Sequence, residues 1–85
     1  MPRERRALAA TVREIRARRA LTQEQLGLDA GYGRAFIGDI EAGRRRPTFE
    51  ALISVARALD VPLVEFVETF ERRLADEPRR SSRAR

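Results

Sequence analysis

Hydrophobic residues recur along this chain at the spacing of amphipathic helices, and no sustained alternation of apolar and polar residues indicates a strand. In residues 4–19, Leu8, Val12 and Ile15 follow one another at intervals of four and three residues, and arginines occupy much of the remaining surface. This spacing places the three apolar side chains on one face of a helix. The pattern therefore predicts an all-α fold that begins with a helix over residues 4–19.

A capping signal marks the start of the second helix. Thr22 is a favourable N-cap residue, and Gln25 stands at the third helical position, which together make a capping box. Leu21 and Leu26 flank this box at the spacing of a hydrophobic staple. The helix is expected to run to about residue 30, because Gly31 suits the left-handed position that follows a helix.

A third, short helix is expected over residues 34–42, although residues 29–43 hold four of the five glycines. Phe36, Ile37 and Ile40 have helical spacing and are predicted to be buried, with Gly43 ending the helix. Glycine inside a helix costs about 1 kcal/mol relative to alanine. The stability of this helix is therefore expected to come from packing of its apolar face.

Two further helices complete the predicted fold. Thr48 caps the fourth, with Glu50 in its first turn, and its apolar stripe is formed by Phe49, Leu52, Ile53, Ala56 and Leu59. The fifth begins near Pro62, and its apolar positions are Leu63, Phe66, Val67, Phe70 and Leu74. Val61 and Phe66 are assigned to the core. We expect one five-helix domain over residues 1–75 and a disordered basic tail over residues 76–85.

Composition excludes several classes of function. The chain has no cysteine and no histidine, so disulfides and the usual ligands of structural zinc are absent, as are thiol nucleophiles and the side chain most used for proton transfer near neutral pH. No nucleophile with an adjacent base is apparent. No apolar run has the length of a membrane span, and the polar start lacks the apolar stretch of a signal peptide. We expect a soluble cytoplasmic protein that is not an enzyme and needs no cofactor or metal.

The charge distribution suggests an anionic partner. All 18 basic residues are arginine, and the net charge is +5. Residues 1–19 carry seven arginines against two glutamates, whereas residues 61–77 carry five acidic residues against two arginines. The guanidinium group is a planar fork that suits phosphate groups and guanine edges. This segregation of charge is typical of proteins that bind nucleic acid with one face.

The second and third predicted helices, joined by residues 31–33 and followed by Arg44, Arg45 and Arg46, form a helix-turn-helix pattern. Over roughly residues 8–67 the chain resembles the helix-turn-helix family of Cro and the phage repressors, and within it the controller proteins of restriction–modification systems. The residues that carry this resemblance are Leu21, Gln23, Leu26, Gly31, Ile37, Ile40, Glu41, Gly43, Pro47, Leu52, Ala56, Leu59 and Val61.

The resemblance implies roles for individual residues. The third helix would lie in the major groove of double-stranded DNA, with base contacts from Arg34, Ala35, Gly38 and Asp39. Phosphate contacts would come from Gln23, Gly33, Arg44, Arg45 and Arg46. Arg16 and Glu41 match positions that form a structural ion pair in the family. For Asp39 two roles stay open: it accepts a hydrogen bond from cytosine, or it steadies a neighbouring arginine.

Departures from the family pattern lie at three glycines and at Arg46, where the family often has asparagine. Gly27 stands where alanine is usual, which is expected to loosen the packing between the two helices slightly. Gly33 replaces a serine or threonine, and Gly38 often replaces a polar residue. Fewer polar side chains then face the groove, so direct readout is expected to depend mainly on Arg34, with help from phosphate contacts and DNA shape.

The fifth helix suggests a homodimer. Leu63, Val67, Phe70 and Leu74 form one apolar stripe, and its last two residues lie beyond the part of the chain that the domain needs. A symmetric partner would cover them. The alternative is that they fold back onto the first helix.

The sequence therefore predicts a homodimeric, sequence-specific transcriptional regulator that binds an inverted repeat and blocks or recruits RNA polymerase. Two other classes remain open. One is an antitoxin-like protein that binds a toxin as well as DNA. The other is a helical interaction module that has lost DNA binding, which the presence of Gln23, Arg34 and the arginines at 44–46 argues against.

Overall fold

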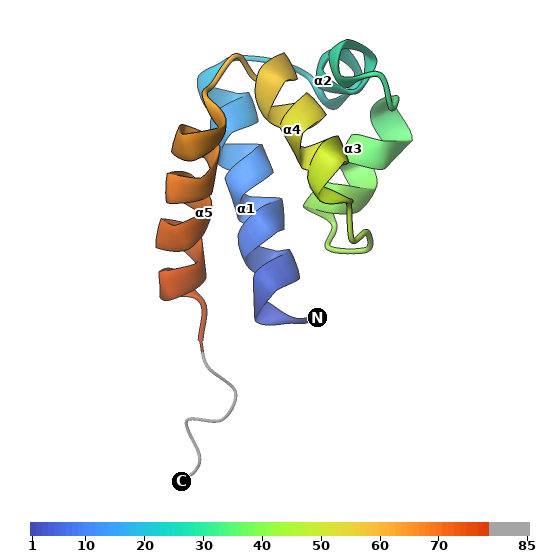
Figure 1. Cartoon of the computed structure of the whole chain (residues 1–85). Helices are drawn as coiled ribbons and strands as arrows, with labels where there is room; N and C mark the ends of the chain where they lie inside the picture. Colours follow the sequence, from blue (N-terminus) through green and yellow to red (C-terminus); the bar gives the residue numbers. More distant parts are fainter. Residues whose placement is uncertain (79–85) are drawn as a thin grey trace, which may run out of the picture.

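A computed structural model of the protein describes residues 1–78 and contains, over that range, five α-helices and no strand (Figure 1). The helices are α1 (Arg3–Arg18), α2 (Gln23–Ala30), α3 (Arg34–Glu41), α4 (Phe49–Ala58) and α5 (Leu63–Asp76). Each helix agrees with its predicted position to within one or two residues, so the predicted all-α class is confirmed.

The predicted helix ends have the expected local geometry. The Thr22 hydroxyl accepts a hydrogen bond from the backbone N–H of Gln25, and the Gln25 side chain accepts one from the Thr22 N–H, which completes the capping box. Thr48 caps α4 in the same way through the N–H of Ala51. These bonds satisfy amide groups that have no partner within the helix, and each cap contributes about 1 kcal/mol.

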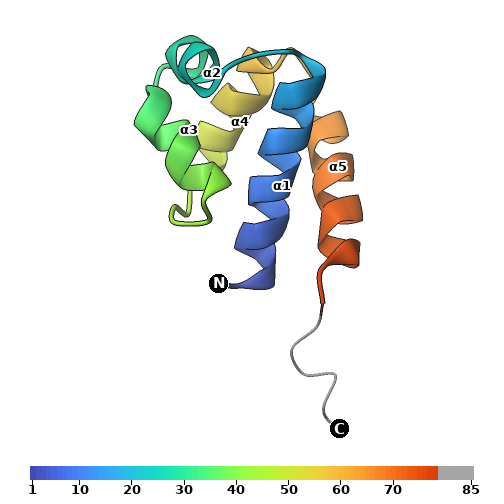
Figure 2. The same cartoon turned by 180° about the vertical axis from the view of Figure 1, so that it is seen from behind.

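Helix α5 returns antiparallel to α1 and lies beside it, whereas α2, α3 and α4 lie on the other side of α1, where α3 packs against α1 and α2 packs against α3 and α4 (Figures 1 and 2). The centre of the core is formed by aliphatic side chains that are almost completely buried: Val12, Ile15, Leu26, Ile37, Ile40, Val55 and Leu59. Val61 and Phe66 join this core, as predicted. Burying each large aliphatic side chain stabilises the fold by about 1.5–3 kcal/mol.

The predicted apolar stripe of α4 was wrong at one end. Phe49 is 62% exposed, although it was assigned to the buried face. Ala51 and Val55 are buried, so the inward face of α4 is rotated toward these smaller residues. Phe49 lies instead at an apolar groove on the surface, described below.

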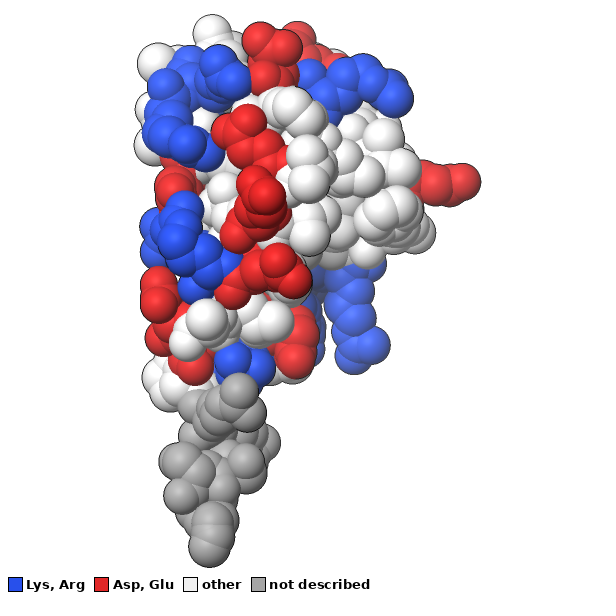
Figure 3. Space-filling model, turned by 60° about the vertical axis from the view of Figure 1, so that its left-hand side comes forward, with Lys and Arg blue, Asp and Glu red and all other residues white. Residues whose placement is uncertain are grey.

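Ion pairs join α5 to α1. Glu14 accepts hydrogen bonds from Arg72 (2.7 Å) and Arg73 (2.7 Å), and Arg6 donates to Glu77 (2.7 Å). The hydrogen bond from Arg72 holds the pKa of the Glu14 carboxyl below its usual range. Seen from the side of α5, acidic side chains run down the molecule and arginines gather beside them (Figure 3). Two arginines of α5 thus pair with a glutamate of α1, and Glu77, just after α5, pairs with an arginine of α1.

The predicted tail begins at residue 76, but Asp76 is the last residue of α5 and Glu77 contacts Arg6. Residues 79–85 of that predicted tail lie outside the described residues. Among residues 1–78, no helix combines the length and the hydrophobicity needed to cross a membrane. The same residues form no cluster of acidic side chains arranged to hold a metal ion.

Candidate nucleic-acid interface

The turn between α2 and α3 is anchored on one carbonyl group. The backbone N–H groups of Tyr32 and Gly33 both donate to the Gly27 oxygen, at 3.0 and 2.9 Å. A Cβ atom at Gly27 would lie 2.3 Å from the Gly33 carbonyl carbon, so only glycine permits this approach. Gly33 itself has φ of 89° and ψ of 166°, a conformation essentially restricted to glycine.

This geometry corrects the expectation that Gly27 loosens the packing of the two helices. The missing side chain lets the turn lie directly against α2, and Gly33 then enters α3 in a conformation that serine or threonine would adopt only with strain. The two departures from the family pattern are therefore coupled. The Gly33 N–H is already used by Gly27, which leaves this residue no further donor for a phosphate.

A buried ion pair ties α3 to α1. Arg16 Nε lies 2.6 Å from Glu41 Oε2, Arg16 Nη2 lies 2.9 Å from Oε1, and the Glu41 side chain is only 5% exposed. Arg16 also donates to the Leu21 carbonyl, and Gln23 Nε2 donates to Glu41 Oε1 at 3.0 Å. The hydrogen bonds that Arg16 donates to the Glu41 carboxylate raise the pKa of Arg16. This network fixes the end of α3 against both α1 and the start of α2.

Sequence reasoning missed two more arginines of α1 that hold the end of α3. Arg13 donates to the Glu41 carbonyl at 2.6 Å, and Arg5 donates to the Gly43 carbonyl at 3.4 Å. Cations suit the carboxyl end of a helix, where carbonyl groups lack intrahelical partners. The spacing of Arg13 and Arg16, three residues apart on α1, was the signal that would have found this pair of contacts.

Apart from Arg34, the outward face of α3 carries small side chains. Arg34 and Ala35 are exposed, and Gly38 and Asp39 are partly exposed, so the four residues predicted to contact bases share the accessible side of the helix. Asp39 forms ion pairs with Arg44 (3.0 Å) and Arg45 (3.8 Å) of the following loop. Arg46 is also exposed but lies by a separate groove, described below. The accessible face of α3 therefore adjoins a cluster of loop arginines.

Replacing Gly38 with alanine is expected to have opposite effects on stability and on DNA binding. A Cβ there would meet only Gln23 Oε1, at an ordinary 3.7 Å, so Gly38→Ala is expected to stabilise the protein by up to about 1 kcal/mol. If α3 lies close to DNA through Gly38, the same variant will bind DNA more weakly. Thermal unfolding and DNA titration of one preparation measure both effects. Equal or tighter DNA binding would show that Gly38 does not set the approach.

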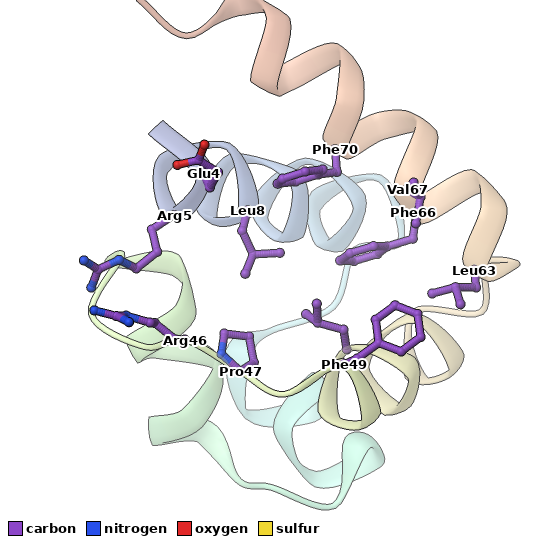
Figure 4. Close-up of a pocket in the computed structure, with 11 residues that line it drawn as sticks. Glu4, Arg5, Leu8, Arg46, Pro47, Phe49, Leu63, Phe66, Val67 and Phe70 are labelled. Atoms are coloured by element: carbon purple, nitrogen blue, oxygen red, sulfur yellow. The ribbon is translucent and has the colours of Figure 1, made fainter. Parts of the chain in front are cut away.

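Three of the four residues predicted to form a dimer interface lie together in the structure, and the fourth lies elsewhere. Leu63, Val67 and Phe70 line an apolar groove of about 430 Å³ between α1, α4 and α5, in which Phe66 and Leu8 form the floor (Figure 4). Phe49 stands at its rim, and Arg5 and Arg46 lie at one end. Leu74 is not among the lining residues; it is half-buried, and its carbonyl accepts a hydrogen bond from Arg3.

The alternative to a dimer, in which α5 folds back onto α1, describes part of this arrangement. Helix α5 packs along α1, and Phe70 contacts the core. That packing does not close the groove, because Val67 is 39% exposed. An apolar surface therefore remains accessible beside α5 in the single chain.

Helices α2 and α3 form a two-helix unit in which α3 is accessible on one side and anchored on its buried side. A loop of arginines lies next to α3. This combination defines a helix-turn-helix DNA-binding protein. The model of the family described as "Helix-turn-helix" matches residues 12–66, and the chain belongs to this family.

Named relatives agree with this assignment. An uncharacterized HTH-type transcriptional regulator, y4dJ of Sinorhizobium fredii (strain NBRC 101917 / NGR234), is 33% identical over 63 residues, which cover 74% of this chain and 82% of the relative. The restriction–modification controller protein C.Esp1396I, solved as a tetramer with its natural 35-base-pair operator, superposes with a TM-score of 0.81 at 25% identity, covering 86% of this chain and 96% of that one.

A second controller protein, C.AhdI from Aeromonas hydrophila, superposes with a TM-score of 0.70 at 29% identity and covers 73% of this chain and 94% of its own. The resemblance to Cro-type regulators and to controller proteins that the sequence indicated is confirmed.

Proposed function

We propose that this protein is a transcriptional regulator that binds an inverted-repeat DNA operator as a homodimer, with one α3 in the major groove of each half-site. The observation that carries the proposal is the accessible face of α3, which presents Arg34 to the outside while its opposite face is fixed by the Arg16–Glu41 pair. The controller protein bound to its operator, which has the same fold, supports this arrangement.

Base contacts in this proposal come from Arg34, Ala35 and the backbone at Gly38. The Arg34 guanidinium is suited to the O6 and N7 acceptors of guanine. Ala35 presents a methyl group, which suits the methyl of thymine. Because the face is otherwise small, α3 can approach the base edges closely, and DNA shape contributes the remaining discrimination.

Phosphate contacts are assigned to Gln23 and to the loop arginines 44–46. The amide nitrogen of Gln23 uses one of its two hydrogens on Glu41, which leaves the second for a phosphate oxygen. The N–H groups of the first turn of α2 lie beside it and favour an anion. Such contacts orient the protein on DNA without reading sequence.

The proposed dimer uses the groove beside α5. Two copies related by a two-fold axis would cover each other's Val67 and Phe49, which are exposed in the single chain. Binding as a dimer to two half-sites squares the discrimination of one half-site. Blocking or recruiting RNA polymerase would follow from the position of the operator, and this role belongs in the cytoplasm, as the sequence suggested. The proposal assigns no catalytic step to any residue.

Val67→Glu tests the dimer. A carboxylate in an apolar interface loses its hydration, so we expect this variant to be monomeric by light scattering and to bind the operator at least tenfold more weakly. Val64→Glu is the matched control, since Val64 is on the same helix and 65% exposed but does not line the groove. A Val67→Glu dimer of normal mass would rule out this groove as the interface.

DNA binding itself is tested by titrating the protein into duplex DNA of mixed sequence at several salt concentrations. The arginine contacts predict an affinity that falls steeply with salt, because each neutralised phosphate releases counterions. Absence of binding at low salt would remove the proposed function and favour a protein-interaction module.

A further inference from the structure

Five residues from the turn, α3 and the loop after it are connected by ring stacking, a cation–π contact and ion pairs. The Tyr32 ring stacks on Phe36 with centroids 4.4 Å apart and an interplanar angle of 20°. The Arg45 guanidinium carbon lies 4.8 Å from the centroid of the same Phe36 ring. Arg45 and Arg44 both face Asp39, at 3.8 and 3.0 Å. We refer to Asp39 and Phe36 as the loop anchor.

In the loop anchor, both oxygens of the Asp39 carboxylate are engaged by loop arginines. Arg44 Nη2 contacts Oδ1, and Arg45 Nη2 contacts Oδ2. Arg45 is held from two directions, by the negative charge of Asp39 and by the face of an aromatic ring, an arrangement that favours a cation. The Asp39 carboxylate therefore points toward the loop and has both oxygens occupied before any DNA binds.

These contacts do little for the fold. The Arg44 and Arg45 side chains are 69% and 45% exposed, and exposed ion pairs contribute little to stability because water and salt screen them. A carboxylate on the outward face of α3 also repels the phosphates of DNA. A benefit must offset this repulsion, and we attribute that benefit to the ordering of the Arg44 and Arg45 side chains.

We propose that Asp39 is a positioning residue that raises the affinity for DNA by holding Arg44 and Arg45 ready for phosphate contacts, with Phe36 and Tyr32 supporting Arg45. This inference rests on the proposed DNA-binding function. A mobile arginine side chain loses conformational entropy when it binds a phosphate. A side chain that is already ordered loses less. The two arginines together outweigh the one negative charge that holds them.

The experiment measures binding of the full chain to a mixed-sequence duplex at fixed salt. Asp39→Ala is compared with Asp29→Ala, which removes one negative charge from an exposed position on α2. If charge alone mattered, both variants would bind more tightly. We expect Asp39→Ala to bind about three- to tenfold more weakly and Asp29→Ala to bind equally or slightly more tightly.

A double-mutant cycle separates positioning from other effects. In a background that carries both Arg44→Ala and Arg45→Ala, Asp39→Ala should no longer weaken binding, since no loop cation remains to be held. Thermal unfolding of each variant identifies any loss due to misfolding. Asp39→Asn, which keeps a hydrogen-bond acceptor but no charge, should fall between the wild type and alanine.

Four outcomes would overturn the inference. Unchanged or tighter binding by Asp39→Ala would show that charge repulsion dominates. An equal loss in the arginine-free background would show that Asp39 acts without the loop. A loss confined to one base pair of a selected operator would make Asp39 a reader of cytosine. If the wild-type protein fails to bind any duplex, the proposed function fails first, and this inference fails with it.

Discussion

Replacing Arg16 with alanine is expected to lower the free energy of unfolding by about 3–5 kcal/mol, because it leaves a buried carboxylate without its charged partner. The Glu41 side chain is 5% exposed and would keep only the amide of Gln23 as a donor. Domains of this size have total stabilities of about 4–13 kcal/mol, so the variant would lose a large share of its stability. Urea unfolding monitored by circular dichroism measures the change.

The matched control is Arg44→Ala, which removes an arginine from an exposed ion pair and is expected to cost less than about 1 kcal/mol. Arg16→Lys should recover part of the loss, since one ammonium group cannot reproduce the two-point contact with the carboxylate. If Arg16→Ala costs no more than Arg44→Ala, the pair does not anchor α3, and the recognition face must be held by packing alone.

The second large effect is expected from Arg34→Ala, which should remove discrimination at one base pair in each half-site. A bidentate arginine–guanine contact contributes about 1–3 kcal/mol of discrimination, and a dimer makes it twice. Binding to mixed-sequence DNA should change little, because phosphate contacts remain. Competition between the operator and single-base variants of it measures the loss.

Gln23→Ala is the control for Arg34→Ala, because it removes a proposed phosphate contact instead of a base contact. A residue that contacts phosphate should weaken binding to all sequences alike when it is removed. Arg34→Ala with an unaltered sequence preference would exclude Arg34 as a reader, and Gln23→Ala with an altered preference would exclude Gln23 from a purely phosphate-binding role.

The sequence was sufficient for the helices and for most of the core because local signals and periodicity agreed. Thr22 with Gln25 marked the start of α2, Thr48 marked that of α4, and Gly31 follows α2 with a positive φ of 84°. The partnership of Arg16 with Glu41 was inferred from family resemblance, and the structure brings the two side chains together. Capping and helical spacing are properties of neighbouring residues, which a sequence displays directly.

Features that depend on how helices lie against one another could not be obtained in this way. The close approach of Gly33 to Gly27 follows from the angle between α2 and α3, and the exposure of Phe49 follows from the rotation of α4. The pairing of Asp39 with the loop depends on the path of residues 42–48 after the helix. Helical periodicity gives a face for each residue, but not the depth at which that face is buried.

The most direct test of the account is to select bound sequences from a pool of random duplex DNA at physiological salt, with the salt concentration stated because affinity depends on it. The account predicts enrichment of an inverted repeat whose half-site centres are separated by about 10 base pairs or a multiple of this, with guanine at a fixed place in each half. Bound DNA without any enriched sequence, or no bound DNA at all, would contradict the claim that this protein reads an operator as a dimer.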